Sequence, residues 1–449
     1  MSRAGRRLSR RDRGWLGTDL YRVVGPLAGP DPAALGAALR AAHAGAPGAP
    51  LLCRLDRTGY RWVPLDPAGF AARLPVLVLC TGVPSTGSES TGPASTAPAG
   101  AGPGTGAGPA GARALLAFLR RQEPGDRPLL LAVHGPWVAL RATHAAGDAA
   151  TVDAWFARLL HDALAGGGTG PYRRPGRLVL PRALARHFGT APATVLPALR
   201  VRRPPVPDPG TGPAAVPAPP VHLHARTGAG ALDALRRHRD RYAPGVSVVA
   251  AVAAALYRTL DRGAGTPLAP GLVVLVNARR YLPSASTVDG NFAWGQYLEP
   301  GDPGDPGAVD AALRAELAGG RPLAMLALRD ARALLPAWPP QARARPAPGT
   351  GGTGPLVLTV THYGRLDGYR GLPWRVPAPD RCFLAAPAPA GPTGITVALA
   401  ELDGVLHLSA GCHPGTVAPG RVRHALELVA ADPVAGWPVA SRAAATPGR

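Results

Sequence analysis

The clearest hydrophobic pattern in the chain is a hairpin followed by an amphipathic helix. Residues 129–135 and 137–143 are apolar runs around a Gly-Pro turn, and they predict two antiparallel strands. Alternate residues of the second run share one face, and His144 continues that row. From Val152 to Leu164 the apolar residues recur at helical spacing. The pattern therefore predicts an imidazole on an apolar, interior strand face next to a helix start.

The same reasoning predicts helices and strands on both sides of a proline-rich stretch. Expected helices cover 31–43, 113–121, 230–242, 248–260, 308–318 and 419–429, and expected strands cover 51–55, 60–64, 74–80, 272–276, 356–360 and a hairpin over 395–409. Residues 81–112 offer almost nothing to bury and are expected to form a disordered insertion. Residues 201–222 are rich in proline and are expected to connect two halves. This predicts an α/β protein with an N-terminal lobe over 1–200 and a C-terminal lobe over 223–449, each a mixed sheet flanked by helices.

Composition changes this picture only in part. Arginine supplies all 49 basic residues, and the net charge is +21. Such an excess favours an anionic partner, although the abundance of Ala, Gly, Pro and Arg also indicates a bias toward GC-rich codons. Basic residues are not interleaved with aromatic ones on one face, so nucleic acid is not an expected partner. The basic segment 1–13 is expected to be mobile or to form a docking edge.

No apolar run approaches the length of roughly 18 residues needed to span a bilayer, and no secretory signal is recognisable. The four cysteines, Cys53, Cys80, Cys382 and Cys412, lack CxxC spacing. That argues against a metal site and against a disulfide framework. A cytoplasmic protein without a bound metal or cofactor is the expectation.

Two ionisable residues near the hairpin carry the candidate chemistry. Histidine suits general-base catalysis because its unperturbed pKa lies near 6.5, so His144 is a candidate base; a core histidine is the alternative. Asp148 either orients His144 or caps the following helix, a position that aspartate fills well.

The five residues from His144 to Asp148, at the end of a hairpin, resemble the HxxxD active-site motif of the chloramphenicol-acetyltransferase-like superfamily, which includes nonribosomal peptide condensation domains. Further segments resemble this superfamily in the same order: the helix Gly245–Tyr257, the strand end Val276–Pro283, the loop Gly290–Phe292, the channel strand Thr359–Gly364 and the turn Asp403–Gly404. The resemblance extends from about Asp31 to Val429. It implies a two-lobed fold with the active site at the lobe interface.

The resemblance also implies roles for single residues. His144 would be the catalytic base, and Asp148 would support the site by pairing with an arginine, either Arg279 or Arg280. Asn277 and Asn291 are the only asparagines of the chain, and their amides suit substrate or backbone hydrogen bonds; turn chemistry is the alternative for Asn291.

Thr361 and His362 end a predicted buried strand. Either is a candidate to stabilise a tetrahedral oxyanion, with a structural role as the alternative.

These features together predict an acyltransferase or condensation enzyme. An acyl group would pass from a carrier-protein phosphopantetheine thioester, or from acyl-coenzyme A, to a small amine or alcohol acceptor. The superfamily usually has a second histidine where Thr143 stands and a glycine where Ala149 stands. The alternative is therefore a catalytically degenerate, condensation-like docking or scaffold protein.

Overall fold

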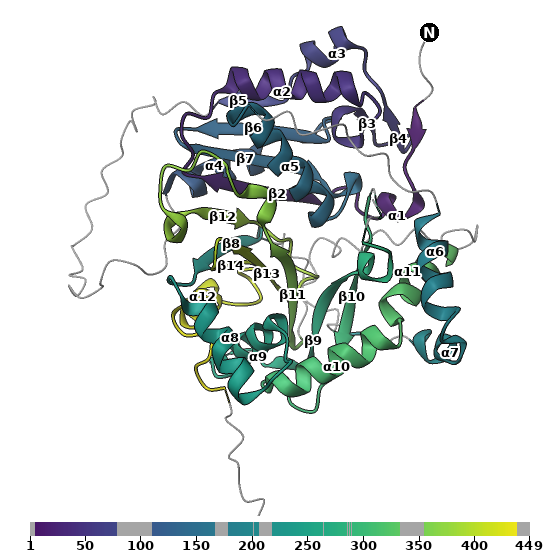
Figure 1. The fold of residues 1–449 in the computed structure, drawn as a ribbon, viewed down its shortest axis with the longest axis vertical. Helices are drawn as coiled ribbons and strands as arrows, with labels where there is room; N and C mark the ends of the chain where they lie inside the picture. Colours follow the sequence, from purple (N-terminus) through teal and green to yellow (C-terminus); the bar gives the residue numbers. More distant parts are fainter. Residues whose placement is uncertain are drawn as a thin grey trace, which may run out of the picture.

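The computed structural model describes residues 5–78, 110–166, 178–200, 202–205, 218–263, 265–284, 286, 288, 290–332 and 354–437. The chain forms two lobes, drawn one above the other in Figure 1. Each lobe is built on one mixed β-sheet with helices packed against it. The predicted two-lobed α/β fold is therefore confirmed.

The N-terminal lobe carries a five-stranded sheet. Its order is β12 (Cys382–Ala385), β2 (Asp19–Gly25), β7 (Trp137–Thr143), β6 (Leu129–His134) and β5 (Val76–Val78). Only β5 and β6 run parallel, and the predicted hairpin is the β6–β7 pair. Helices α2 (Pro32–Gly45) and α5 (Ala149–Leu164) cover one face of this sheet, and α4 (Ala110–Arg121) covers the other. Alternate residues of β7 therefore enter two different cores, and the whole strand is buried.

A small sheet and a short helix complete the upper part of this lobe. The sheet contains β1 (Arg6–Arg7), β4 (Arg61–Val63) and β3 (Arg54–Asp56), and the helix is α3 (Pro67–Ala72). The basic N-terminal segment pairs with β4 and continues into α1 (Arg10–Arg13). The expectation of a mobile segment is therefore wrong for the described residues from 5 onward, whereas the alternative of a docking edge stays a prediction.

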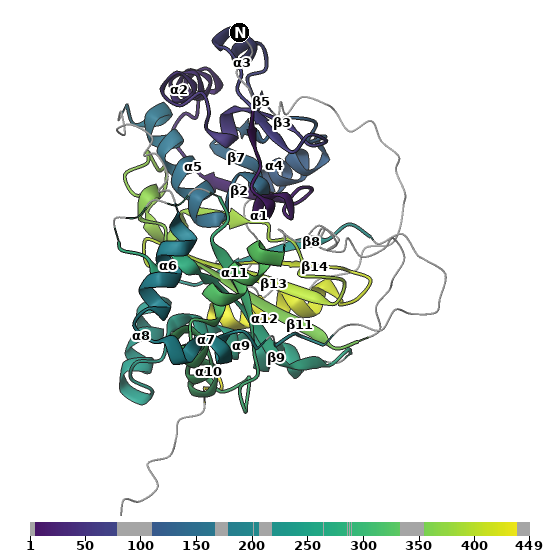
Figure 2. The ribbon, with the colours of Figure 1, turned by 90° about the vertical axis from the view of Figure 1, so that its right-hand side faces the viewer.

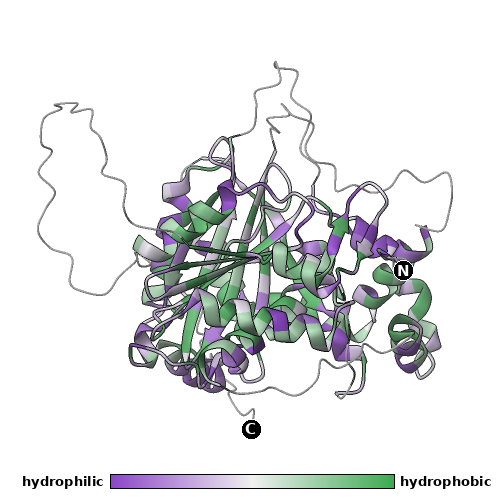
Figure 3. Ribbon diagram, turned by 90° about the horizontal axis from the view of Figure 1, so that it is seen from above, coloured by the Kyte–Doolittle hydropathy of each residue, from purple (hydrophilic) through white to green (hydrophobic). Residues whose placement is uncertain are grey.

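The C-terminal lobe carries a six-stranded sheet. Its order is β10 (Ala293–Leu298), β9 (Leu268–Asn277), β11 (Leu356–Arg365), β13 (Gly394–Leu402), β14 (Val405–Cys412) and β8 (Val221–Arg226). The central strand β11 is parallel to both of its neighbours. The main core of this lobe includes residues of α8 (Ala231–Tyr242), α9 (Val248–Asp261), α10 (Pro306–Ala318) and α12 (Pro419–Ala431). In Figure 3 the strands inside the molecule are largely white to green, whereas the helices carry purple patches on their outer sides.

Two segments cross between the lobes. Strand β12 lies late in the chain but pairs with β2, in a register that places Cys382 opposite Gly25. Helices α6 (Val179–Phe188) and α7 (Val195–Ala198) lie against α11 (Arg321–Arg332) (Figure 2). The local hydrophobic pattern predicts neither the pairing of β12 with β2 nor the packing of α6 and α7 on α11.

Several predicted boundaries need correction. The helix expected at 113–121 begins at Ala110, so the end of the proposed insertion 81–112 is helical; the rest of that insertion lies outside the described residues. Most of the segment 201–222 also lies outside them, and β8 begins at Val221. Strands β9 and β11 are longer than expected because each is paired on both sides. Within the described residues no helix is long and apolar enough to cross a membrane.

The cysteines of the described segments are all free thiols. Cys53, Cys382 and Cys412 are buried without a disulfide partner, and Cys80 lies outside the described residues. Burial raises the pKa of the Cys53 thiol to about 11 and that of Cys382 to about 12, which keeps both protonated near neutral pH. Neither has the depressed pKa of a reactive nucleophile.

Candidate functional site

His144 lies immediately after β7, in a short 3-10 turn that covers His144–Ala146. Its backbone N–H donates to the carbonyl of Thr18 at 2.8 Å. The alternating pattern of the strand thus stops before His144, and the prediction that it continues the apolar strand face is wrong. The side chain is half-buried and lies flat on the indole of Trp15, with ring centroids 3.8 Å apart and an interplanar angle of 9°. Stacking covers a face of the imidazole, whereas its nitrogen lone pairs lie in the ring plane.

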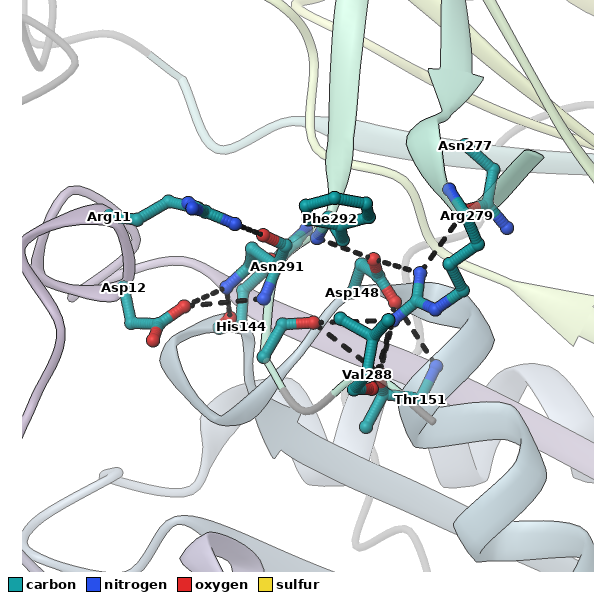
Figure 4. Close-up of polar contacts among 11 residues, drawn as sticks. Arg11, Asp12, His144, Asp148, Thr151, Asn277, Arg279, Val288, Asn291 and Phe292 are labelled. Atoms are coloured by element: carbon teal, nitrogen blue, oxygen red, sulfur yellow. Dashed lines mark hydrogen bonds and ion pairs between the residues drawn. The ribbon is translucent and has the colours of Figure 1, made fainter. Parts of the chain in front are cut away.

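Asp148 is both a helix cap and one half of a buried ion pair (Figure 4). Its Oδ1 accepts from the Thr151 backbone N–H at 3.1 Å, which satisfies an N-terminal donor of α5. Its Oδ2 accepts from Arg279 at 2.6 Å and from the Phe292 backbone N–H at 2.9 Å. One carboxylate thereby connects the helix after the motif to the opposite lobe.

Electrostatics keep the Asp148 carboxylate charged. Burial alone would raise its pKa, but Arg279 and the hydrogen bonds from Phe292 and Thr151 outweigh burial and hold the pKa below its ordinary value. A second bond from Arg279 Nη2 to Thr151 Oγ1, at 2.9 Å, fixes the guanidinium. The predicted pairing with an arginine is thus present, and Arg279 rather than Arg280 is the partner.

Asn291 joins three segments beside His144. Its side-chain amide donates to the His144 backbone carbonyl at 2.8 Å and to Asp12 Oδ1 at 2.9 Å, and its backbone carbonyl accepts from Arg11 at 3.0 Å. The backbone approaches closely here because Gly147 and Gly290 form an isolated parallel bridge. At Gly290, φ is +79°, a conformation that glycine adopts readily.

The N-terminal segment therefore belongs to the site, which the sequence pattern did not predict. Asp12 contacts Asn291, Arg11 forms an ion pair with Asp330 of α11, and Trp15 stacks on His144. The one sequence signal was a tryptophan within a strongly basic segment, and it gave no indication of its partner. These contacts hold the N-terminal segment against residues of both lobes.

The remaining predicted site residues lie on β9 and β11. Asn277 and Arg280 are exposed at the end of β9 and in the turn that follows, and His362 is half-buried on β11. All three line one cavity of about 250 Å³. Burial, with a smaller contribution from Arg236, lowers the pKa of His362 to about 4, so its imidazole is neutral near pH 7. Thr361, which precedes His362 along the strand, is buried and points to the other face of the sheet.

Of the two departures from the superfamily motif, the one at Ala149 is structurally accommodated, whereas the one at Thr143 leaves a buried hydroxyl unpaired within the described part of the chain. Ala149 is the first residue of α5 and is not among the residues with positive φ, so no glycine is required there. Thr143 is buried at the end of β7, and its hydroxyl has no hydrogen-bond partner among the described residues. The described residues also contain no group of three His, Cys, Asp or Glu side chains placed to hold a metal ion.

Comparison with known proteins gives structural but not sequence matches. No protein-family model and no curated protein sequence matches the chain. The structure is similar to the first condensation domain of the calcium-dependent antibiotic synthetase, with a TM-score of 0.56 and 18% identity over 97% of this chain and 98% of that one. It is also similar to polyketide synthase associated protein 5 from Mycobacterium tuberculosis, with a TM-score of 0.54 and 17% identity over 95% and 97% of the two chains.

A third similar structure is the epimerization domain from the third module of tyrocidine synthetase B, with a TM-score of 0.52 and 12% identity over 93% of each chain. The chain therefore has the two-lobed fold of condensation domains. Since the same fold also serves an epimerization domain, the fold alone does not decide the reaction.

Proposed function

We propose that this protein is an acyltransferase of the condensation type. It transfers an acyl group from a thioester to an amine or alcohol acceptor, with His144 as the general base. The observation that carries the proposal is the arrangement around His144: the imidazole stacks on Trp15, and the turn that holds it is fixed by Asn291 and by the Asp148–Arg279 pair. A half-buried base, held from both lobes, is the arrangement that bimolecular acyl transfer requires.

The proposed reaction is a direct transfer. An in-plane nitrogen of His144 takes the proton of the acceptor as the acceptor's nitrogen or oxygen bonds to the thioester carbonyl carbon. The tetrahedral intermediate then expels the thiolate, which receives the proton back from the imidazolium. The products are a free thiol and an amide or ester, with no covalent enzyme intermediate. Asp148 takes no part in proton transfer and acts as a positioning residue, since its oxygens bond to α5, Arg279 and the Phe292 backbone.

The donor is either an acyl carrier protein or acyl-coenzyme A. Both are anionic, and both present the acyl group on a phosphopantetheine arm. The net charge of +21 supports this choice, because a positive surface attracts either donor over a distance.

A scaffold function is the second candidate, and the N-terminal segment favours it. Arg11 pairs with Asp330, Asp12 binds Asn291, and Trp15 covers one face of His144. Contacts that hold the N-terminal segment to both lobes suit a protein whose lobes stay fixed while it binds a biosynthetic partner.

A single experiment separates the two candidates. Acyl-loaded carrier proteins and acyl-coenzyme A are incubated with the protein and an amine acceptor, and loss of the acyl group is followed by mass spectrometry. Enzyme-dependent loss that disappears in a folded His144→Ala variant is expected. Equal loss in the wild type and the variant would refute His144 as the base. Stable binding of the carrier protein without any transfer would support the scaffold.

A further inference from the structure

A cavity of about 250 Å³ lies in the C-terminal lobe, between β9, β11 and the start of α9. We refer to it as the β9–α9 cavity. Its apolar walls are formed by Val249, Val274, Leu275, Val276 and Leu313, and its polar groups belong to Asn277, Arg280 and His362. Five apolar residues with three convergent polar groups have the composition of a small-molecule site.

The polar groups lie mainly at one end of this cavity. Asn277 and Arg280 are exposed, whereas Val274, Val276 and Leu313 are buried in the core of the lobe. No described residue forms an ion pair with the Arg280 guanidinium. A cation next to an apolar cavity favours a ligand with an apolar body and one anionic group. The apolar body then leaves water for the apolar walls, and the anionic group pairs with the guanidinium.

His362 contributes a neutral hydrogen-bonding group to the wall. Its imidazole forms no hydrogen bond with any described residue, and burial keeps it uncharged near pH 7. A second positive charge is therefore absent from the wall, and Arg280 alone among the lining residues attracts an anion. A neutral imidazole both donates and accepts, so it suits a carbonyl or hydroxyl of the ligand.

The cavity is coupled to the candidate site through one turn. Asn277 caps that turn by accepting from the Arg279 N–H at 3.0 Å, and Arg279 holds Asp148 at 2.6 Å. Arg280 is the next residue, so consecutive arginines serve the ion pair and the cavity. A ligand on Arg280 thus lies one residue from the contact that fixes the His144 motif.

We infer that the β9–α9 cavity binds the acyl group of the substrate, a mainly apolar chain of medium length with an anionic group held by Arg280 and Asn277. This deepens the proposed acyl transfer and rests on it for the identity of the ligand as an acyl group. The anionic group is a carboxylate on the acyl chain, at the end remote from the thioester. Its two oxygen atoms are ones that a guanidinium binds through parallel hydrogen bonds.

The volume sets a limit on chain length. An apolar cavity of about 150 Å³ accommodates benzene, so the volume here corresponds to a body of about ten non-hydrogen atoms. Each methylene that enters is expected to strengthen binding about fourfold, and the gain should stop near eight carbons.

Binding is measured by titration calorimetry on the full chain, without an acceptor, so that no turnover is needed. The probes are free fatty acids from butanoate to dodecanoate, octanoyl-pantetheine and octanoyl-4′-phosphopantetheine. Tighter binding of octanoate than of octanoyl-pantetheine identifies a carboxylate at Arg280. The phosphorylated thioester should bind no tighter than the unphosphorylated one, because its phosphate lies at the far end of the arm; tighter binding would overturn the assignment of a carboxylate. Affinity that is independent of both chain length and charge would overturn the inference.

Variants locate the site. Val249→Phe fills the cavity from a half-buried wall position, and it is expected to weaken octanoyl binding at least tenfold while butanoate changes little. Arg280→Gln is expected to weaken the anionic probes about tenfold. Leu428→Phe and Arg423→Gln, both exposed on α12, are the matched controls and should bind as the wild type does. Unchanged binding in both cavity variants, Val249→Phe and Arg280→Gln, would overturn the inference.

The two proposals fail separately. Binding that persists in His144→Ala, without transfer in the wild type, would contradict only the catalytic proposal. Transfer that depends on His144 but ignores the cavity variants would contradict only the cavity assignment.

Discussion

Trp15 and His144 lie with parallel rings 3.8 Å apart, although one belongs to the N-terminal segment and the other follows β7. This stack restrains the imidazole from the side of its face, whereas the ring nitrogens lie in the ring plane and are not covered by the indole. Aromatic stacking of this kind contributes about 0.5–1.5 kcal/mol beyond its buried area. Trp15 is therefore a positioning residue for the proposed base.

Replacement of Trp15 should lower the rate of transfer without weakening substrate binding. We expect Trp15→Ala to reduce kcat about three- to tenfold, since the lost restraint has about the energy of one stack, with KM nearly unchanged. Trp15→Phe should restore most of the rate because a phenyl ring also stacks. Steady-state kinetics test this, and NMR of the His144 ring protons should show the loss of the indole ring current in Trp15→Ala. A change confined to KM would contradict a positioning role.

Asn291 should control how firmly the N-terminal segment is attached. Asn291→Ala removes the amide that binds both Asp12 and the His144 carbonyl, and it leaves buried polar groups without partners. We expect a loss of about 1–3 kcal/mol in the free energy of unfolding. Limited trypsin digestion should also cleave faster within Arg10–Arg13. Asn277→Ala is the control, because Asn277 is exposed and does not contact this segment; equal cleavage in both variants would refute the prediction.

The Asp148–Arg279 pair should be strongly coupled. Its side chains are 8% and 20% exposed, so removal of either partner leaves the other charge largely desolvated. We expect Asp148→Asn and Arg279→Met each to lower the free energy of unfolding by about 3 kcal/mol. The double variant should lose clearly less than the sum, because both substitutions remove the same interaction. Chemical denaturation of the four proteins measures this, and additive losses would show that the pair is not coupled.

This pair also predicts a pH dependence. The pKa of Asp148 is lower in the folded protein than its ordinary value of 3.8. Its contribution to stability is therefore present above pH about 4 and is lost as the pH falls through the folded pKa. The difference in stability between the wild type and Asp148→Asn should shrink steadily below pH 4. A difference that stays constant down to pH 2 would contradict this assignment.

The half-buried His224 and the buried His407, at the junction of the lobes, predict a further loss of stability as the pH falls, in a pH range above that of Asp148. His224 and His407 face each other on β8 and β14, with Nε2 and Nδ1 3.4 Å apart. Burial, followed by the nearby Arg226, lowers the pKa of His224 to about 4, and burial also places the pKa of His407 well below its ordinary value of 6.5.

Because these folded pKa values are depressed, the unfolded chain binds protons below pH 6.5 that the folded chain does not. Stability should therefore fall as the pH drops from 6.5 toward 4, by about 3 kcal/mol for His224 alone. His224→Gln should reduce this slope in denaturation measured at several pH values. Arg423→Gln, a surface substitution on α12, should leave the slope unchanged, and an equal slope in His224→Gln would refute the prediction.

The local pattern of apolar and polar residues was sufficient to predict the helix and strands on either side of His144. The apolar alternation of 129–143 predicted the β6–β7 hairpin, and Asp148 before an apolar helical stripe predicted the start of α5. Both depend on neighbouring residues, because strand alternation and helix capping are set by backbone geometry within a few positions. The same logic failed at His144, where the chain leaves the strand one residue earlier than the pattern implies.

The sequence alone determined that this chain buries two sheets in two lobes and places a histidine and an aspartate at a hairpin end. Only the tertiary structure decided which residues meet them. It selected Arg279 over Arg280, brought Trp15 onto His144, added β12 to the sheet of the other lobe, and grouped Asn277, Arg280 and His362 around one cavity. The physical reason is that hydrophobic periodicity specifies which face of an element is buried, whereas partners distant in the sequence depend on how the two lobes pack together.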